Sequence, residues 1–207
     1  MTRLLIATRS LGKQAEFREL LSSLPLEIIF PSDVGLVESP EEADLELFDT
    51  FEENARSKAR WFATQSGLAA LADDSGLEVD ALGGAPGVHS KRFAGLAGPD
   101  ELVTEANNAH LLARLAGGAG TRRTARYRCV LVLVRGRGQR ELVASGSTEG
   151  VILESPRGAN GFGYDPLFFS RDLGRSFGEA SAEEKHRVSH RARAVSALIE
   201  LLRGGRV

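Results

Sequence analysis

The stretch Leu71-Ala-Asp-Asp-Ser-Gly-Leu77 joins a short apolar run to two adjacent carboxylates and a Ser-Gly pair. The apolar run predicts a buried strand, so Asp73 and Asp74 would stand at its carboxyl end, where open α/β sheets place their ligand crevices. Alternation along a strand predicts that the two side chains point to opposite sides. One carboxylate could hold Mg²⁺ or a water molecule while the other braces the loop. An ordinary acidic turn is the alternative, because Asp-Ser-Gly is also good turn chemistry.

The segments before this stretch alternate between strand and helix patterns. Leu4 to Thr8 predicts a buried strand, and the helix after it is indicated by apolar residues at helical spacing: Phe17, Leu20, Leu21 and Leu24. Thr50-Phe-Glu-Glu53 is a capping box for a second helix that runs toward Gln65. That helix leads into the strand with the two acids. The order of elements therefore predicts an α/β fold.

The segments after it add a hairpin and a final helix. Two strand-like runs, Tyr127 to Arg135 and Glu141 to Ala144, flank Gly136-Arg-Gly138 and predict an antiparallel pair. Ser181-Ala-Glu-Glu184 is a second capping box, and the last helix can turn four apolar residues to the core: Val195, Leu198, Ile199 and Leu202. Two long glycine-bearing loops, 83–98 and 158–166, are candidates for functional loops.

Composition narrows the class of protein. A chain of 207 residues with 42% hydrophobic content predicts a single domain, of one lobe or two. The formal net charge of −2 gives no overall electrostatic reason to bind nucleic acid or an anionic membrane. The single cysteine, Cys129, excludes an internal disulfide and lies in an apolar run, so it predicts a buried thiol in a cytosolic protein. No stretch approaches the length of a membrane span.

Three further groups of residues suggest phosphate and nucleotide chemistry. The loop Thr8-Arg-Ser-Leu-Gly-Lys13 joins a strand to a helix, so its backbone N–H groups and Lys13 could receive a phosphate, although it is not a Walker A loop. Lys58 shares a helix face with Asn54 and could reach a phosphate chain. Phe162-Gly-Tyr-Asp165 offers two rings and a carboxylate for a flat base. The alternatives are a solvated lysine in each of the first two cases, and two core aromatic residues in the third.

The acidic stretch upstream of the second helix is usually a solvated loop. Its members are Glu38, Glu41, Glu42, Asp44 and Glu46. One of them could be a second Mg²⁺ ligand, because hard cations take carboxylate and water oxygens. Near the carboxyl end, cationic donors on or beside the last helix could recognise purine keto oxygens or phosphates; they are Lys185, His190 and Arg191.

Taken in order, these motifs resemble the inosine/xanthosine triphosphate pyrophosphatase family over nearly the whole chain. The matching segments are Thr8 to Lys13, Thr50-Phe-Glu-Glu-Asn-Ala-Arg-Ser-Lys58-Ala, Ala72 to Gly87, Asn160-Gly-Phe-Gly-Tyr-Asp-Pro166, and Ser181 to Lys185 followed by Ser189-His-Arg191. The central block and the Phe-Gly-Tyr-Asp loop are the most specific parts. The first-loop lysine and the last cations gain meaning from their order and spacing.

The resemblance implies a fold and an activity. The fold would be α/β, a mixed elongated sheet flanked by helices, with two lobes and a central nucleotide cleft in one domain over residues 1–207. The activity would be Mg²⁺-dependent hydrolysis of deaminated purine nucleoside triphosphates (ITP, dITP, XTP) to the monophosphate and pyrophosphate. The resemblance also implies a homodimer. The cysteine usage, the net charge and the lengths of the apolar runs predict a cytoplasmic protein with no stable nucleic-acid partner and no membrane association.

The family's functional residues map onto matching positions of this sequence. Asp74 would be the catalytic residue and a metal ligand, Glu46 the second metal ligand, and Ser75 a substrate contact. The triphosphate would be held by Lys58 and by the first loop, which comprises Thr8, Arg9, Ser10, Leu11, Gly12 and Lys13. Phe162, Gly163, Tyr164 and Asp165 would surround the base. Lys185, His190 and Arg191 would complete nucleotide recognition.

Two departures from the family pattern are visible. Ser10 stands where the family usually has Asn, so it keeps a hydroxyl but lacks the reach of an amide toward a phosphate or water. His89 stands where Tyr is common and is expected to be a loop or interface residue rather than a catalytic base.

Two other functions fit parts of the sequence. A nucleotide pyrophosphatase of the septum-formation inhibitor type would share the α/β architecture and act on modified pyrimidine nucleotides, but the Phe162 to Asp165 loop and the His190-Arg191 pair argue against it. A nucleic-acid-binding module is suggested by a cluster of arginines: Arg122, Arg123, Arg126, Arg128, Arg135, Arg137 and Arg140. A solvated sheet face explains the cluster better, because alternate strand residues face opposite ways.

Overall fold

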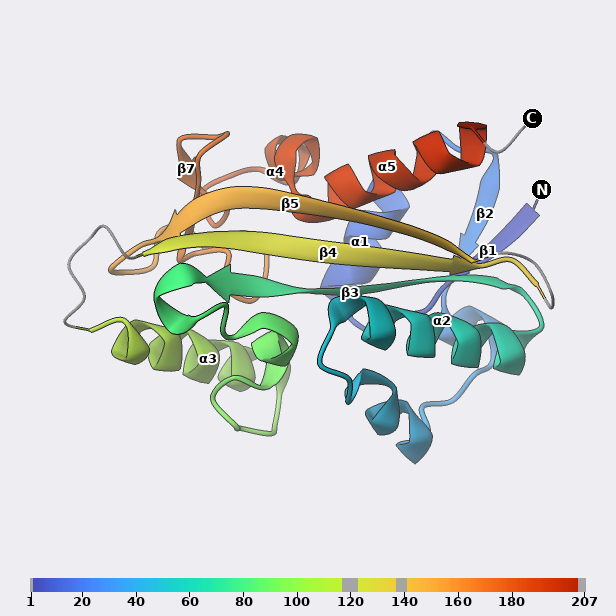
Figure 1. The fold of residues 1–207 in the computed structure, drawn as a ribbon, viewed down its shortest axis with the longest axis horizontal. Helices are drawn as coiled ribbons and strands as arrows, with labels where there is room; N and C mark the ends of the chain where they lie inside the picture. The colour runs from blue at the N-terminus through green and yellow to red at the C-terminus, as the bar shows by residue number, and fades with distance from the viewer. Residues whose placement is uncertain (1, 117–122, 137–140, 205–207) are drawn as a thin grey trace. The chain divides into compact units, whose positions relative to one another are not determined.

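The computed structural model describes residues 2–116, 123–136 and 141–204 (Figure 1). The α-helices are α1 (Leu11–Leu20), α2 (Phe51–Ser66), α3 (Asp100–Arg114), α4 (Ala182–Val188) and α5 (His190–Gly204). Short 3-10 helices are η1 (Pro31–Val34), η2 (Pro40–Glu46), η3 (Asp80–Leu82) and η4 (Gly87–Arg92). The strands are β1 (Thr2–Ile6), β2 (Leu26–Ile29), β3 (Ala69–Val79), β4 (Thr124–Val134), β5 (Leu142–Ile152), β6 (Phe168–Ser170) and β7 (Arg175–Ser176).

The strands form one mixed sheet in the order β2-β1-β3-β4-β5-β6-β7. β1 pairs in parallel with β2 and β3, whereas β6 pairs antiparallel with β5 and β7. The predicted α/β class with a mixed sheet flanked by helices is confirmed. β4 and β5 are neighbours in the sheet, as expected for the predicted hairpin. Residues 137–140, which were expected to form its turn, lie outside the described residues.

The chain forms two compact units, each assembled from separate segments. Unit 1 comprises the described residues within Met1–Asp74, Cys129–Gly146 and Arg191–Val207, and unit 2 those within Ser75–Arg128 and Ser147–His190. Strands β3, β4 and β5 each supply residues to both units.

The core of unit 1 follows from alternation along its strands. On β1, Leu4 and Ile6 pack with α1 and α5, whereas Leu5 packs with α2 on the other side. On β3, Leu71 belongs to the first cluster and Ala70 to the second. Successive strand residues point to opposite faces, so strands that are apolar at every position need helices on both. Figure 1 shows α5 and α2 on opposite sides of these strands.

Helix α2 begins where its capping box predicts. Thr50 is the N-cap, and its side chain accepts a hydrogen bond from the backbone N–H of Glu53 at 3.2 Å. Phe62, on the inward face of this helix, is 2% exposed. The capping box at Ser181 likewise opens α4. Local sequence therefore fixes where both helices start, and burial fixes which face of α2 turns inward.

Unit 2 has an aromatic core. The Tyr127 ring lies 4.7 Å from that of Phe168 and 6.0 Å from that of Phe177, measured between centroids. Leu77 of β3 and Leu111 of α3 pack in the same cluster. This core supports the loop that follows β5, because part of that loop is buried in it.

Strand β3 does not end at the two acids, so the prediction that Asp73 and Asp74 stand at its carboxyl end is wrong, and so is the alternative of an acidic turn at Asp-Ser-Gly. The strand continues to Val79. A Cβ added at Gly76 would lie 2.3 Å from the carbonyl oxygen of Gly87 and 2.5 Å from Oγ of Ser90. Gly76 is therefore explained by the close approach of η4 to the strand, and not by turn geometry.

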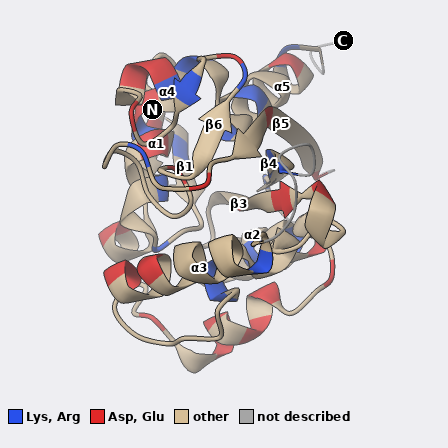
Figure 2. Cartoon of the chain, turned by 90° about the vertical axis from the view of Figure 1, so that its left-hand side faces the viewer, with Lys and Arg blue, Asp and Glu red and all other residues tan. Residues whose placement is uncertain are grey.

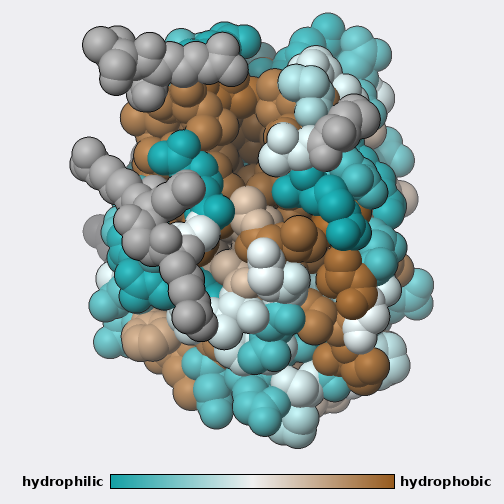
Figure 3. Space-filling model, turned by 90° about the vertical axis from the view of Figure 1, so that its right-hand side faces the viewer, coloured by the Kyte–Doolittle hydropathy of each residue, from teal (hydrophilic) through white to brown (hydrophobic). Residues whose placement is uncertain are grey.

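Unit 1 also contains an apolar cavity of about 210 Å³. Figure 3 shows apolar side chains gathered around this hollow. Its lining includes Leu4, Leu24, Leu133 and Leu198, and none of the site residues predicted from the sequence is among its described lining residues. Within the described residues, no helix is both long enough and apolar enough to pass through a bilayer.

Candidate active site

The loop between β1 and α1 is held in shape by hydrogen bonds among its own polar groups. Ser10 is the N-cap of α1, with its hydroxyl accepting from the backbone N–H of Lys13 at 3.5 Å. Thr8 Oγ1 accepts from the backbone N–H of Ser10 at 3.2 Å, and Gln14 Nε2 donates to the carbonyl of Thr8 at 3.2 Å. Leu11 is 79% exposed at the start of the helix. The loop thus presents a helix N-terminus with a short hydroxyl side chain at the cap.

Arg9 has a structural partner. Its guanidinium donates twice to the carboxylate of Glu42, at 2.7 and 2.6 Å, and once to the carbonyl of Leu36, at 3.1 Å. Hydrogen bonding to Glu42 raises the pKa of Arg9. Most of the acidic stretch forms the 3-10 helix η2, and Glu42 anchors the first loop, whereas Glu38, Glu41 and Asp44 are exposed to solvent as expected.

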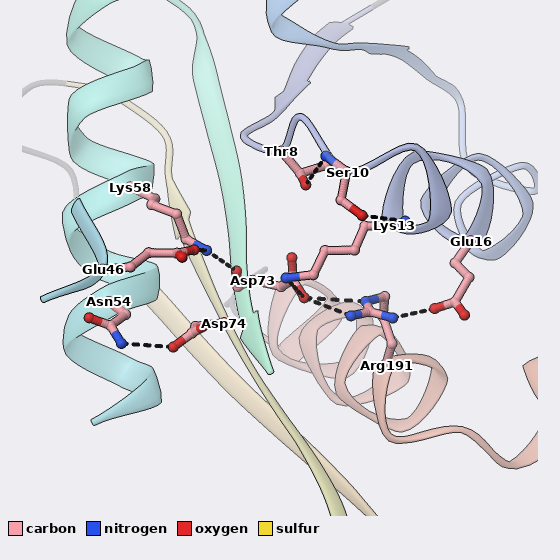
Figure 4. Close-up of polar contacts among 10 residues, drawn as sticks. All are labelled: Thr8, Ser10, Lys13, Glu16, Glu46, Asn54, Lys58, Asp73, Asp74 and Arg191. Atoms are coloured by element: carbon pink, nitrogen blue, oxygen red, sulfur yellow. Dashed lines mark hydrogen bonds and ion pairs between the residues drawn. The ribbon is translucent and has the colours of Figure 1, made fainter. Parts of the chain in front are cut away.

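Asp73 is the centre of a buried charge network in unit 1 (Figure 4). Oδ2 of Asp73 lies 3.1 Å from Nζ of Lys13 and accepts from Nη2 of Arg191 at 2.9 Å. The Asp73 side chain is fully buried. Burial alone would raise the pKa of Asp73, but the charges of Lys13 and Arg191 outweigh it, so the pKa is strongly lowered. Asp73 is thus held as a carboxylate.

Arg191 completes this network from α5. Its Nη1 donates a short hydrogen bond to Glu16 of α1, and its side chain is only 1% exposed. The guanidinium therefore bridges two carboxylates, those of Glu16 and Asp73. Glu16 was not among the predicted site residues. The sequence feature that points to Glu16 is its position three residues after Lys13, on the same face of the predicted helix.

Asp74 faces the opposite way, toward α2 (Figure 4). Its Oδ2 accepts from Nδ2 of Asn54 at 2.9 Å, and the residue is 6% exposed. The backbone N–H of Phe48 in turn donates to Oδ1 of Asn54, which orients the amide. Burial raises the pKa of Asp74, and the opposing charges of Lys58 and Lys13 do not cancel the effect. The predicted alternation of Asp73 and Asp74 is confirmed, and the two carboxylates have opposite pKa shifts.

Lys58 is buried rather than solvated, so the alternative of an exposed helix lysine is wrong. Its Nζ makes a short contact with Oε1 of Glu46 and donates to the backbone carbonyl of Asp73 at 2.6 Å. Chiefly through the charge of Lys58, the pKa of Glu46 is lowered to about 2. Glu46 also raises the pKa of Asp74, so these two carboxylates lie close enough to repel.

The donor set near Glu46 and Asp74 suits a hard cation. Among the described residues, no group of three or more His, Cys, Asp or Glu side chains could hold a metal ion by itself. Mg²⁺ does not need such a group, because it is usually bound through one or two carboxylates, several waters and substrate phosphates. Two mutually repelling carboxylates fit that pattern, since a cation between them would relieve the repulsion.

In unit 2, the base loop (Phe162–Asp165) is organised around Asp165. Oδ2 of Asp165 accepts from the backbone N–H of Phe162 at 2.8 Å and from Nζ of Lys185 at 2.6 Å. Nζ of Lys185 also lies 4.7 Å from the centroid of the Phe162 ring, which is partly exposed. Gly161, just before the loop, has a φ of +75°, and a Cβ there would lie 2.0 Å from Oδ2 of Asp165.

The other ring of the loop lies in the core. Tyr164 is 4% exposed, and its hydroxyl donates to the carbonyl of Ser90 at 2.9 Å. His190 stacks on Tyr127 at 4.7 Å between centroids. The three cations grouped by the sequence thus have different partners, because Lys185 binds Asp165, His190 packs on Tyr127, and Arg191 binds Asp73. Ser75 follows Asp74 on β3 and is half-buried.

The arginine-rich stretch has acidic partners. Arg126 lies 3.0 Å from Asp80 and 3.2 Å from Glu149, and Arg128 lies 3.7 Å from Glu78. Figure 2 shows acidic and basic residues interspersed on the face it presents. These contacts favour the solvated sheet face over a nucleic-acid-binding module, for which a continuous basic surface is expected. Arg122, Arg137 and Arg140 lie outside the described residues.

Comparisons with known proteins agree with the fold and with the family resemblance of the sequence. Residues 4–201 match the model of the Ham1 family. A dITP/XTP pyrophosphatase of Geobacter sulfurreducens is 47% identical over 96% of this chain and 95% of its own length. The structure of a HAM1 protein from Coxiella burnetii is 36% identical, with a TM-score of 0.84 over 99% of this chain and all of the other. A nucleoside-triphosphatase / dITP/XTP pyrophosphatase from Mycobacterium abscessus is 42% identical, with a TM-score of 0.72 over 96% of this chain and 99% of the other.

Proposed function

The chain belongs to the Ham1 family, and we propose that it hydrolyses deaminated purine nucleoside triphosphates to the nucleoside monophosphate and pyrophosphate. ITP, dITP and XTP are the expected substrates. The observation that carries the proposal is that the two adjacent acids have different surroundings. Asp73 is held by the cations Lys13 and Arg191, whereas Asp74 is oriented by Asn54 on the other side of the strand, near Glu46.

The triphosphate binds, in this proposal, to the cations of unit 1. Lys13 and Lys58 are both held by acidic partners, so their ammonium groups are already positioned before a nucleotide arrives. The backbone N–H groups at the start of α1 add donors that favour an anion. Because Arg9 is bound to Glu42, its contribution would come through its backbone rather than its guanidinium.

Asp74 is the proposed general base. Asn54 donates to one of its oxygens and so orients the carboxylate, as a general base requires. The oxygen of a water bonds to the α-phosphorus while its proton passes to Asp74. The bond from the α-phosphorus to the bridging oxygen breaks, and pyrophosphate leaves with the electron pair. Glu46 and Asp74 would hold Mg²⁺, which when bound withdraws negative charge from the phosphates.

The base binds, in this proposal, to unit 2. The partly exposed ring of Phe162 can stack on any purine, and Lys185 with Asp165 can recognise hydrogen-bonding edges. A hydrogen-bond donor placed to bind the six-keto oxygen of a deaminated purine would face the six-amino group of adenine, which is also a donor. Both donors would then be unpaired, so ATP would bind poorly. Guanine shares the keto oxygen, so rejection of GTP must depend on its two-amino group.

The test is pyrophosphate release from a panel of nucleotides with and without Mg²⁺. The panel contains ITP, dITP, XTP, ATP, GTP and modified pyrimidine triphosphates, and the Asp74→Asn variant is the control. We expect hydrolysis of the deaminated purines alone, dependent on Mg²⁺ and lost in the variant. Preference for modified pyrimidines would favour the septum-formation inhibitor type. Salt-dependent binding of duplex or single strands without hydrolysis would favour a nucleic-acid-binding module.

The homodimer stays a prediction from the family resemblance, and the cytoplasmic location a prediction from cysteine usage. Light scattering at several protein concentrations tests the first, and fractionation of the source cells tests the second.

A further inference from the structure

Helix α3 contains none of the residues that the sequence assigned to the site, yet it contacts the base loop directly. Nδ2 of Asn108 donates to the carbonyl oxygen of Gly163 at 3.1 Å. Gly163 follows Phe162, whose ring is partly exposed, and precedes the buried Tyr164. The helix and the loop belong to the same compact unit. Asn108 therefore restrains the backbone at the middle of the base loop.

The preceding residue of α3 fastens the same loop by a second route. Oδ1 of Asn107 accepts from the backbone N–H of Ala94 at 2.8 Å, and its Nδ2 donates to the carbonyl of Lys91 at 2.9 Å and to that of Ser90 at 3.4 Å. The same Ser90 carbonyl accepts from the hydroxyl of Tyr164. Two consecutive asparagines thus tie α3 to the base loop, one directly and one through η4.

The second polar atom of Asn108 indicates what this side chain is for. Its Oδ1 is buried and has no hydrogen-bond partner among the described residues. A buried acceptor without a partner lowers stability, so an apolar side chain of similar size would suit folding better at this position. The contact with Gly163 is the one hydrogen bond of this amide among the described residues, and it acts on the base loop.

We propose that Asn108 is a positioning residue for the purine base. It holds Gly163 so that Phe162 and Asp165 are ordered before substrate arrives. This inference rests on the proposed function, because it takes the base loop to be the base-binding segment. Ordering a loop in advance removes a cost from binding and leaves the chemical step unchanged. Loss of Asn108 should therefore raise KM for dITP with little change in kcat.

The test compares Asn108→Leu with Val103→Ala. Val103 lies on the same helix and is buried, but its side chain is purely apolar and so makes no hydrogen bond to the base loop. We expect Asn108→Leu to raise KM for dITP about fivefold, the effect of losing one ordinary hydrogen bond, with kcat within about twofold and Tm unchanged or raised. Val103→Ala should lower Tm and leave KM unchanged. The inhibition constant of pyrophosphate, which has no base, should not change in either variant.

A double-mutant cycle tests whether Asn108 acts through the loop. In a Phe162→Ala background, Asn108→Leu should add less than about a twofold increase in KM, because the ring that it positions is gone. Asn108→Asp is a second variant of the same size that replaces the N–H donor with a carboxylate oxygen, and it should raise KM as well. It supplies the same comparison if the leucine variant does not fold.

Three results would overturn the inference. These are an unchanged KM in Asn108→Leu, an equal rise in KM and in the pyrophosphate inhibition constant, and full additivity with Phe162→Ala. If the wild-type protein hydrolyses dITP and XTP while Asn108→Leu matches it, only this inference fails. A wild-type protein without that activity overturns the proposed function and the inference together.

Discussion

Replacing each of the adjacent acids by its amide should separate folding from catalysis. Asp73→Asn removes the carboxylate that Lys13 and Arg191 share in a buried network. Removing one partner of a buried ion pair costs about 3–5 kcal/mol, because the remaining charges stay buried without compensation. For a chain of this length each kcal/mol corresponds to about 2–4 °C, so Tm should fall by about 6–20 °C.

Asp74→Asn should leave stability nearly unchanged and abolish most of the turnover. Because burial already raises the pKa of Asp74, its charged form is not favoured by folding, and an amide of the same shape should change the unfolding free energy by less than about 1 kcal/mol. Turnover should fall by about 10²–10⁴-fold, the usual contribution of a general base. The measurements are thermal and urea unfolding at neutral pH and pyrophosphate release from dITP. Wild-type stability in Asp73→Asn, or near wild-type turnover in a folded Asp74→Asn, would refute the reasoning.

Four further outcomes are expected. Lys13→Ala and Lys58→Ala should each lower kcat/KM for ITP and XTP alike, since a charged hydrogen bond is worth about 1.5–3 kcal/mol; a change confined to the ratio of ITP to GTP would contradict phosphate binding. Phe162→Ala should lower kcat/KM for every purine triphosphate by about 1–3 kcal/mol, the range for base stacking, without inverting preference. Arg191→Ala should lower Tm and reduce the efficiency with ITP and ATP by similar factors, because its buried guanidinium bridges Asp73 and Glu16; a loss confined to ITP would assign Arg191 to base recognition instead. In Glu46→Gln, the free energy of unfolding should fall less steeply as the pH is lowered from about 5 to 2. The pKa of Glu46 in the folded protein is about 2, so the stability that its carboxylate contributes is present above the ordinary value of 4.5 and is lost as pH falls toward 2. The same pH dependence in the variant and the wild type would argue against the Glu46–Lys58 pair.

Much of the fold follows from patterns shorter than one helix. The capping boxes at Thr50 and Ser181 predict where α2 and α4 begin, since the relevant hydrogen bonds close within three residues. Alternation predicts that Asp73 and Asp74 diverge, because strand geometry alone decides it. These features could be predicted because the groups that determine them are neighbours in the sequence.

The partners of the charged residues could not be predicted in this way. Arg191 meets Asp73 across 118 residues and Glu16 across 175, so no local pattern indicates either contact. The same holds for the strand end expected at Asp73 and Asp74, since β3 continues past both residues. Ser75-Gly76 favours a turn by composition, but η4 approaches the strand there and requires a residue without a side chain. Long-range packing overrides local preference at these positions.

The interleaving of the two compact units affects how the protein can be synthesised. Unit 1 needs Ala194, Val195 and Leu198 for its core, yet these residues leave the ribosome after every residue of unit 2. Vectorial folding, in which an early domain is finished while a later one is still being translated, is therefore not open to this chain. The first strands of the nascent polypeptide must stay able to pack with α5 until that helix has been synthesised. For the same reason, no single cut in the gene can release either half as an autonomous module, so the two units must be inherited and exchanged together.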